Sequence, residues 1–261
     1  MSQKIDSAEW RRRSRRAFLT AAGAGALGAL GLAWVYTRGQ EGELPWPLRT
    51  VHRANERLWH SLYDPSRTGE TPPSPPPGTL SRVNGDIGLD DDIDPSEWRL
   101  TVATPGVSRP PAALTLERLR RMPQTETTEL FKCIEGWSEP IAYKGVRFSD
   151  FLTETGTGTR DGSPWAPGKP AASLFRYVGL ETPDGNYYVS LDMESMLNPK
   201  TLLALEINGA PLTDEHGAPL RLITPVKYGI KSLKRIGRIF FADERPRDYW
   251  AEEGYDWYSG L

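Results

Sequence analysis

A single cysteine, Cys133, carries the most versatile side chain of this 261-residue sequence. A thiolate can attack a substrate or bind a soft or high-valent metal, although a free cysteine can also be a small buried apolar residue. Residues 131–138 read Phe-Lys-Cys-Ile-Glu-Gly-Trp-Ser. An apolar residue precedes the cysteine and a turn-like run follows it. The pattern predicts a strand that delivers the thiol to the mouth of a loop.

Positive charge gathers in the C-terminal third, at Arg221, Lys227, Lys231, Lys234, Arg235 and Arg238. Glycine-rich turns lie between these residues, so backbone N–H groups are also available. Cations and free N–H groups are what a phosphate-bearing ligand needs, although a solvated strand face is an alternative. One organic ligand would explain both features if the cations held its phosphate end and the thiolate bound a metal at its other end.

The small numbers of cysteines and histidines exclude or disfavour several other kinds of site. One cysteine excludes an intrachain disulfide framework and any cysteine-rich zinc or iron–sulfur site. The histidines are His52, His60 and His216, so we expect any metal to arrive inside a cofactor rather than in a three-histidine centre. A cysteine hydrolase is the weakest alternative, because a thiolate nucleophile needs a nearby base and His216 is the only histidine in the body of the chain.

The N-terminal segment differs in charge from the rest. Residues 1–38 hold seven basic and two acidic residues, so they carry about +5 of a total charge of −2, and the remainder carries about −7. A mildly acidic body disfavours nucleic acid as the main partner.

The leader also carries a recognisable signal. Residues 14–20, Ser-Arg-Arg-Ala-Phe-Leu-Thr, match a twin-arginine export signal, and an apolar run follows to Tyr36. About 20 apolar residues can equally span a bilayer as an ordinary anchor. We therefore expect residues 1–37 to be a twin-arginine signal or an N-terminal anchor, and the protein to be periplasmic or otherwise extracytoplasmic. Twin-arginine export moves folded proteins, which suits a protein that receives its cofactor first.

Residues 38–79 are predicted to form a helix and a linker. Leu48, Val51, Asn55, Leu58 and Leu62 recur at helical spacing within residues 44–63. A proline-rich extended arm follows at 72–78. The acidic triplet at 90–92 lacks the alternation of a calcium loop and is expected to be a solvated turn.

Residues 80–261 are predicted to form the catalytic domain. Strands are expected at 98–102, 129–133, 174–180, 187–191, 202–207, 220–224 and 233–242. Short helices are expected at 114–121, capped near Thr115, after Phe148, and at 193–196. Asn208-Gly209 predicts a hairpin. Many strands with few short helices indicate an α+β fold with mixed β-sheets.

Four ordered stretches resemble the sulfite-oxidase-type molybdopterin oxidoreductases, and most closely their bacterial periplasmic methionine sulfoxide reductases. Residues 132–138 with Gly145-Val146 resemble the cofactor-ligand segment, and 177–182 the threonine-bearing strand. Residues 216–221 resemble the pterin-binding turn and 225–234 the phosphate-binding run. The likeness spans about residues 81–261 and implies a fold like the molybdopterin-binding domain of sulfite oxidase.

The resemblance also implies roles. Cys133 would be the thiolate ligand of molybdenum, in a cofactor with one pterin per metal. His216 and Arg221 would contact the pterin, and the phosphate end would lie on Ser232, Leu233 and Lys234. The full set of implied cofactor-binding residues is Asn84, Cys133, Thr182, His216, Arg221, Ser232, Leu233 and Lys234.

The implied reaction is oxygen-atom transfer. Sulfite oxidases of animals and plants carry an arginine soon after the cysteine, whereas here Glu135 and Trp137 follow, which suits a neutral sulfoxide such as protein methionine sulfoxide. Methionine sulfoxide reductases carry asparagine at the position of His216 and sulfite oxidases carry histidine, so sulfite oxidation stays an alternative. A non-enzymatic, exported anion-binding module is another. Trp137 could instead be core packing, and Tyr228 is a further candidate for the substrate mouth.

No Cys-x-x-Cys-His motif for haem attachment is present. The resemblance therefore implies a separate electron-transfer partner, such as a haem-bearing membrane protein.

Overall fold

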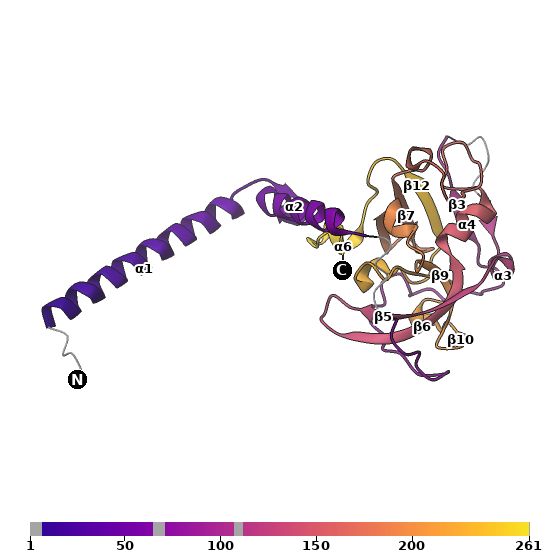
Figure 1. Ribbon diagram of the computed structural model, residues 1–261, viewed down its shortest axis with the longest axis horizontal. Coiled ribbons are helices and arrows are strands. Elements are labelled where there is room, and N and C mark those ends of the chain that lie inside the picture. The colour runs from indigo at the N-terminus through magenta and orange to yellow at the C-terminus, as the bar shows by residue number, and fades with distance from the viewer. Residues whose placement is uncertain (1–6, 65–70, 107–111, 261) are drawn as a thin grey trace. The chain divides into compact units, whose positions relative to one another are not determined.

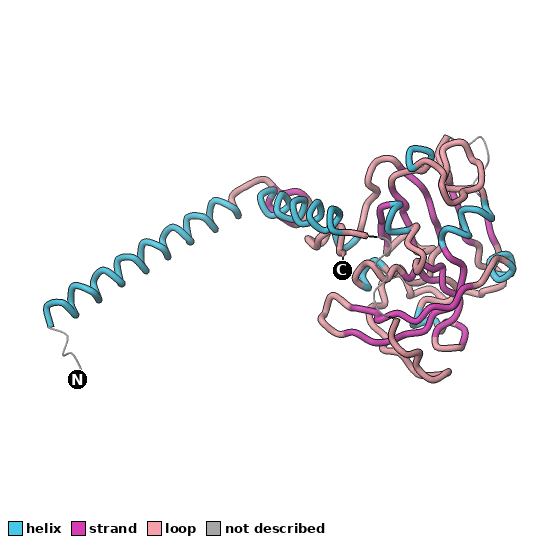
Figure 2. The backbone as a smooth tube through the Cα atoms, in the orientation of Figure 1, coloured by secondary structure: helices cyan, strands magenta, loops and turns pink. Residues whose placement is uncertain are grey.

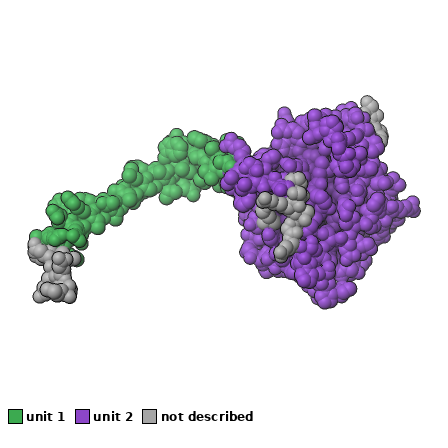
Figure 3. Space-filling view, viewed as in Figure 1, with its two compact units in different colours: residues 1–54 green, residues 55–261 purple. Residues whose placement is uncertain are grey.

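The computed structural model describes residues 7–64, 71–106 and 112–260. Residues 1–6 of the predicted leader, 65–70 of the predicted helix and linker, and 107–111 and 261 of the predicted catalytic domain lie outside the described residues. The chain divides into two compact units, residues 1–54 and 55–261 (Figure 3).

The first unit is mainly helical. Helix α1 (Ser7–Tyr36) is followed by a short hairpin of β1 (Gln40–Glu41) and β2 (Leu44–Pro45). Helix α2 (Trp46–Leu62) begins in the first unit and ends in the second, which confirms the predicted helix. Helix α1 is long and apolar enough to cross a membrane, a property that signal sequences share.

The second unit contains two five-stranded sheets (Figure 1). The first has the order β10-β9-β6-β5, with β11 also paired to β9, and all of its pairs are antiparallel. Its strands are β5 (Thr125–Lys132), β6 (Ser138–Arg147), β9 (Leu202–Ile207), β10 (Ala210–Pro211) and β11 (Arg221–Ile223).

The second sheet has the order β4-β3-β12-β7-β8. Strands β3 and β12 run parallel, and the other neighbours are antiparallel. The strands are β3 (Leu100–Ala103), β4 (Ala112–Leu114), β7 (Tyr177–Glu181), β8 (Tyr188–Asp192) and β12 (Arg238–Ala242).

The helices of the second unit are short, so the α+β prediction is confirmed (Figure 2). Helix α3 (Leu116–Arg121) begins after Thr115, whose hydroxyl accepts a hydrogen bond from the Arg118 amide at 3.2 Å, as an N-cap does. The others are α4 (Phe148–Thr155), α5 (Met193–Met196), α6 (Tyr249–Glu252) and the 3-10 helices η1 (Ala171–Ser173), η2 (Asp214–His216) and η3 (Gly229–Lys231).

The main core joins the two sheets. Alternation along β3 buries Leu100 and Val102, and α4 adds Phe148 and Phe151 to the same cluster. Burial of each such side chain stabilises the fold by about 1.5–3 kcal/mol. A second cluster, which includes Tyr143 of β6, packs separately. Both clusters include residues of the first sheet, whose ends carry the loops of the site.

The last predicted strand is shorter than expected, because β12 begins only at Arg238 rather than at residue 233. Arg235 has a left-handed backbone with φ 50°, which a strand cannot accommodate. The buried Arg235 guanidinium donates to the carbonyls of Leu89 and Asp91. These hydrogen bonds hold the chain around Arg235, just before β12, in place.

The proline-rich arm is attached to the first sheet. The Gly78 amide donates to the Asn208 carbonyl at 2.7 Å, and the Asn208 side chain donates to the Thr79 carbonyl at 2.9 Å. The arm therefore delivers residue 84 to the end of this sheet.

Candidate functional site

The loop between β5 and β6 holds Cys133 just beyond the end of its strand. Lys132 pairs with Ser138, so residues 133–137 form the connection. The Cys133 amide donates to the Trp137 carbonyl at 3.0 Å, and the Gly136 amide donates to the Cys133 carbonyl at 3.1 Å. Gly136 has φ 91°, which favours glycine. The prediction that a strand delivers the thiol to a loop is confirmed.

Cys133 lines a pocket built from several parts of the chain. Residues 84–87, which follow the proline-rich arm, contribute together with the β5–β6 hairpin, the residue before β8, β11, the run after β11 and α6. Four of the predicted site residues meet here, namely Asn84, Cys133, Arg221 and Lys234. The pocket is lined also by Gly85, Ile87, Phe131, Trp137, Tyr187, Gly229, Ile230 and Trp250.

The thiol is linked directly to Asn84, in the segment that follows the arm. The Asn84 side-chain amide donates to Cys133 Sγ at 3.5 Å. Lys234 Nζ donates to the carbonyl oxygens of Asn84 and Gly85, at 2.9 and 2.7 Å. Lys234 therefore orients the asparagine that contacts the thiol.

Arg221 lines this pocket and also has an unsatisfied buried donor. The side chain is buried, and its Nη1 donates to the His216 carbonyl at 3.0 Å. Its Nε is buried and has no hydrogen-bond partner among the described residues. A buried unpaired donor costs about 1–3 kcal/mol. An acceptor on a bound ligand would remove that cost.

Lys234 places a second cation beside Arg221. Burial, and then the positive charge of Arg221, lower the pKa of Lys234 to about 8. The ammonium group is still mainly protonated at neutral pH. Neither cation has an ion-pair partner among the described residues, although the charges of Asp86 and Glu215 also act on Lys234. Two neighbouring cations of this kind favour an anionic ligand.

The other four cations of the predicted cluster do not share this pocket. Each lies within 4 Å of a carboxylate elsewhere, so the cluster does not act as one anion site. The pairs are Lys227–Asp192 at 3.4 Å, Lys231–Asp248 at 2.5 Å, Arg235–Asp214 at 3.3 Å and Arg238–Glu181 at 3.0 Å.

His216 is engaged by the protein. Its Nε2 lies 3.3 Å from the Ser81 carbonyl, which can only accept, so Nε2 carries the proton. Its Nδ1 lies 2.7 Å from Thr213 Oγ1 and accepts from that hydroxyl. Burial, and then the charge of Arg221, lower the pKa of His216. The neutral ring thus holds the backbone at Ser81, and the contact of His216 with a pterin stays a prediction.

Ser232 and Leu233 flank Lys234 but have other side-chain contacts. The Ser232 hydroxyl accepts from the Thr224 amide at 3.5 Å, and Leu233 is part of the main core. Their predicted role at the phosphate end therefore stays a prediction, which Leu233 could fulfil only through its backbone, whereas the Ser232 hydroxyl still has a proton to donate.

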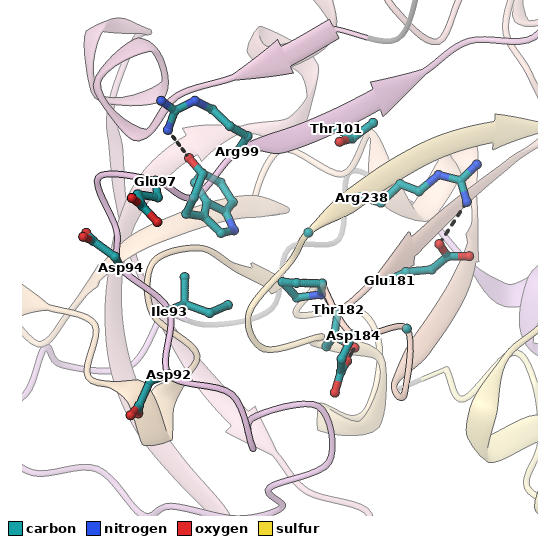
Figure 4. A pocket seen from close by; sticks show the side chains of 14 residues that line it. Asp92, Ile93, Asp94, Glu97, Arg99, Thr101, Glu181, Thr182, Asp184 and Arg238 are labelled. Atoms are coloured by element: carbon teal, nitrogen blue, oxygen red, sulfur yellow. Dashed lines mark hydrogen bonds and ion pairs between the residues drawn. The ribbon is translucent and has the colours of Figure 1, made fainter.

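Thr182 lines a different cavity, of about 600 Å³, which Figure 4 shows among the carboxylates of Asp92, Asp94 and Glu97. Its hydroxyl donates to Asp184 Oδ1 at 2.5 Å and accepts from the Tyr187 amide at 3.1 Å. Thr182 thus shapes the turn that leads to Tyr187, and its predicted cofactor contact stays a prediction. Across the described residues, no group of three His, Cys, Asp or Glu side chains could hold a metal ion.

Sequence reasoning missed Tyr187, Ile230 and Trp250. The Trp250 indole donates to the Tyr187 hydroxyl at 2.9 Å, which donates to the Ile230 carbonyl at 2.7 Å. One signal was available, because Asp248 is a favourable N-cap before Tyr-Trp-Ala and indeed begins α6.

Gly229 lets the run after β11 approach the hairpin. A Cβ at this position would lie 2.5 Å from Phe131 Cζ. Trp137 lines the pocket, and the Arg82 guanidinium lies 4.8 Å above its ring centre. Tyr228 lies directly before Gly229 in the chain, but it is not among the described residues that line the pocket.

Comparison with known proteins gives a consistent result. The sequence model of the oxidoreductase molybdopterin binding domain matches residues 87–250. YedZ1 of Azospira oryzae, named as a candidate protein-methionine-sulfoxide reductase subunit, is 31% identical over 95% of this chain and 88% of its own length.

Catalytic subunits named protein-methionine-sulfoxide reductase MsrP match over a shorter length. That of Gluconobacter oxydans is 33% identical over 64% of this chain, and the chain spans 55% of that protein. The crystal structure of the sulfane dehydrogenase SoxCD from Paracoccus pantotrophus overlaps with a TM-score of 0.48 at 24% identity, covering 59% of this chain and 40% of that one.

Proposed function

Because this chain belongs to the oxidoreductase molybdopterin-binding family, we propose that it is an exported enzyme that reduces a sulfoxide, such as methionine sulfoxide in proteins, by oxygen-atom transfer. The observation that carries the proposal is that the only cysteine shares one pocket with Arg221 and Lys234. Membership of an oxidoreductase family disfavours both the cysteine hydrolase and the non-enzymatic anion-binding module.

The residues of the pocket fit a molybdopterin cofactor by their chemistry. Cys133 offers the thiolate that a soft or high-valent metal prefers. Arg221 Nε and Lys234 offer donors to an anionic group, and Asn84 orients the thiol. We propose that these four residues, with Thr182, His216, Ser232 and Leu233 around them, hold one pterin per metal in a domain of residues 80–261. When bound, the cofactor supplies the two-electron chemistry of oxygen-atom transfer.

The walls beside the thiol suit a neutral substrate. Phe131, Trp137 and Trp250 present ring surfaces that favour apolar thioether and sulfoxide side chains. Glu135 accepts from the Trp137 indole at 3.2 Å and opposes an approaching dianion. Sulfoxide reduction takes up two electrons and two protons, and it releases a thioether and water. The names of the relatives support this substrate class.

Sulfite oxidation is the second candidate, and Arg82 favours it. Its guanidinium lies above Trp137 at the pocket wall, close in sequence to Asn84. Together with Arg221 and Lys234 it would give an anion a positive approach.

A direct comparison of turnover separates the two candidates. The cofactor-loaded protein is given a peptide that contains methionine sulfoxide with a reduced dye, or sulfite with an oxidised one. We expect kcat/KM for the sulfoxide to exceed that for sulfite. The reverse order would replace sulfoxide reduction with sulfite oxidation, and no turnover of either would overturn the proposed function.

Export and electron supply extend the proposal. The twin-arginine pair lies within α1, ahead of the apolar run of that helix, and supports export of the loaded protein to the periplasm, with α1 as signal or anchor. The relatives named as subunits support a separate partner. We propose a membrane protein that delivers electrons, with haem as its redox group.

Anion binding should depend on pH through Lys234. Its pKa of about 8 means that the side chain is charged below that pH and neutral above it, so binding weakens as the pH rises. Between about pH 7 and pH 9, sulfate affinity of the cofactor-free protein should fall by up to roughly tenfold. Calorimetric titration measures the sulfate affinity. Sulfate keeps its charge between these pH values, so a change in affinity reports on the protein.

The matched control is Lys234→Gln, which should bind sulfate more weakly and with little change between the two pH values. Equal sulfate affinity of the wild-type protein at both values would contradict an anion site at Lys234.

A further inference from the structure

A buried ion pair lies behind the wall of the cysteine pocket. Lys231 Nζ is 2.5 Å from Asp248 Oδ2, and both side chains are 2% exposed. Neither residue lines the pocket. A buried ion pair is often no more stable than well-packed apolar groups of similar size. A gain in fold stability therefore does not by itself explain this pair.

The pair joins two segments that each line the pocket. Lys231 lies directly after Ile230 and directly before the run of Ser232 to Lys234. Asp248 is the N-cap of α6, where its Oδ1 accepts from the Ala251 amide at 3.1 Å. Trp250, two residues after Asp248, lines the pocket from that helix.

The connection closes into a ring of side chains. From Asp248 it continues along α6 to Trp250, from the indole to the Tyr187 hydroxyl, and from there to the Ile230 carbonyl beside Lys231. A closed ring leaves these segments little freedom to move apart, because each is held at two points.

Strand β8 anchors the ion pair from behind. The Ser190 amide donates to Asp248 Oδ2 at 2.9 Å, and Lys231 Nζ donates to the Ser190 carbonyl at 3.3 Å. The Ser190 hydroxyl accepts from the Trp257 indole at 2.7 Å, which ties in the end of the chain. Both partners therefore have a fixed position relative to the second sheet.

We propose that Lys231 and Asp248 are positioning residues, which set the distance between Trp250 and the Ser232–Lys234 run and thereby the fit of the substrate. The inference rests on the proposed function and deepens it. Catalytic geometry tolerates displacements of only about 0.5 Å, and polar groups one layer behind a site typically affect its performance by about 10- to 100-fold.

The test needs a variant that folds. Asp248→Asn alone leaves a buried unpaired ammonium and should lower Tm by about 10 °C. The double variant Lys231→Met/Asp248→Asn removes both charges and keeps an acceptor for the Ala251 amide at the N-cap, although the Ser190 amide loses its acceptor. It leaves no buried charge, so it should fold with a smaller loss of Tm than Asp248→Asn alone. The matched control, Lys200→Met/Glu129→Gln, removes a pair that is 15% and 8% exposed and does not line the pocket.

Two readouts are combined on these variants. Hydrogen exchange of the cofactor-free protein measures how firmly residues 248–255 are held. Steady-state kinetics with methionine sulfoxide measures how well the substrate fits the pocket. For the Lys231/Asp248 double variant we expect faster exchange in this segment. We also expect kcat/KM to fall by about tenfold or more, mainly through KM. The control pair should change neither.

The positioning role is overturned if the Lys231/Asp248 variant exchanges as the wild type does, or if its exchange rises while KM stays unchanged. It is also overturned if the control pair raises KM equally. Failure of the proposed function looks different, because the wild-type protein itself would then not reduce the sulfoxide, while exchange of residues 248–255 would still report whether the pair holds that segment.

Discussion

Replacing Cys133 by serine should remove molybdenum from the purified protein and lower sulfoxide turnover by more than about 100-fold. Loss of groups behind a metal site already costs about 10- to 100-fold, and the proposed ligand itself should cost more. Serine is nearly isosteric, and the loop is held by backbone hydrogen bonds of residues 133, 136 and 137, so the fold should persist. Metal analysis of protein from a host that makes the cofactor measures the effect.

Ile134→Ala is the matched control for this change. Ile134 occupies the same loop, is 38% exposed and does not line the pocket. The Ile134→Ala protein should keep the molybdenum content and the thermal stability of the wild type. If the Cys133→Ser protein retained a full equivalent of molybdenum and normal turnover, the metal would not depend on this thiol, and the assignment of the site would be wrong.

Replacing Arg221 by glutamine should give the second-largest effect, on retention of the cofactor. A hydrogen bond to a charged group contributes about 1.5–3 kcal/mol, so affinity should fall by roughly 10- to 150-fold. The reason is that Arg221 lines the pocket and its buried Nε has no hydrogen-bond partner in the described part of the chain. Dilution of the loaded protein, followed by measurement of released pterin, gives the dissociation rate.

Two further variants separate binding from folding. Arg238→Gln removes a 48% exposed arginine that pairs with Glu181 away from this pocket, so retention should be unchanged. Lys234→Gln removes the less buried of the two pocket cations and should weaken retention with less risk to the fold. Wild-type retention in both the Arg221 and Lys234 variants would show that the anionic end binds elsewhere.

The local parts of the site could be predicted from sequence. A strand, a cysteine and a glycine turn are adjacent along the chain, so the local sequence of residues 129–138 predicts that the thiol lies at the end of a strand. The cap at Thr115 and the hairpin at Asn208 follow the same logic. In each case the contacts that decide the structure lie within a few residues.

The electrostatic and tertiary parts could not be predicted in this way. Six cations close in sequence separate in space, because Arg221 and Lys234 meet at the pocket whereas the other four pair with carboxylates elsewhere. Trp250 and Tyr187 meet only because α6 packs beside the start of β8, at a separation of 63 residues. Such contacts depend on the arrangement of the sheets and leave no pattern in the local sequence.

The most direct test asks whether the sulfur at position 133 is bonded to the metal. Because the chain has one cysteine, selenocysteine incorporated in its place labels a single site. Molybdenum K-edge X-ray absorption of this protein, loaded with unlabelled cofactor, should show a molybdenum–selenium bond. A spectrum with only sulfur and oxygen ligands, from protein shown by mass spectrometry to carry selenium, would contradict Cys133 as the ligand.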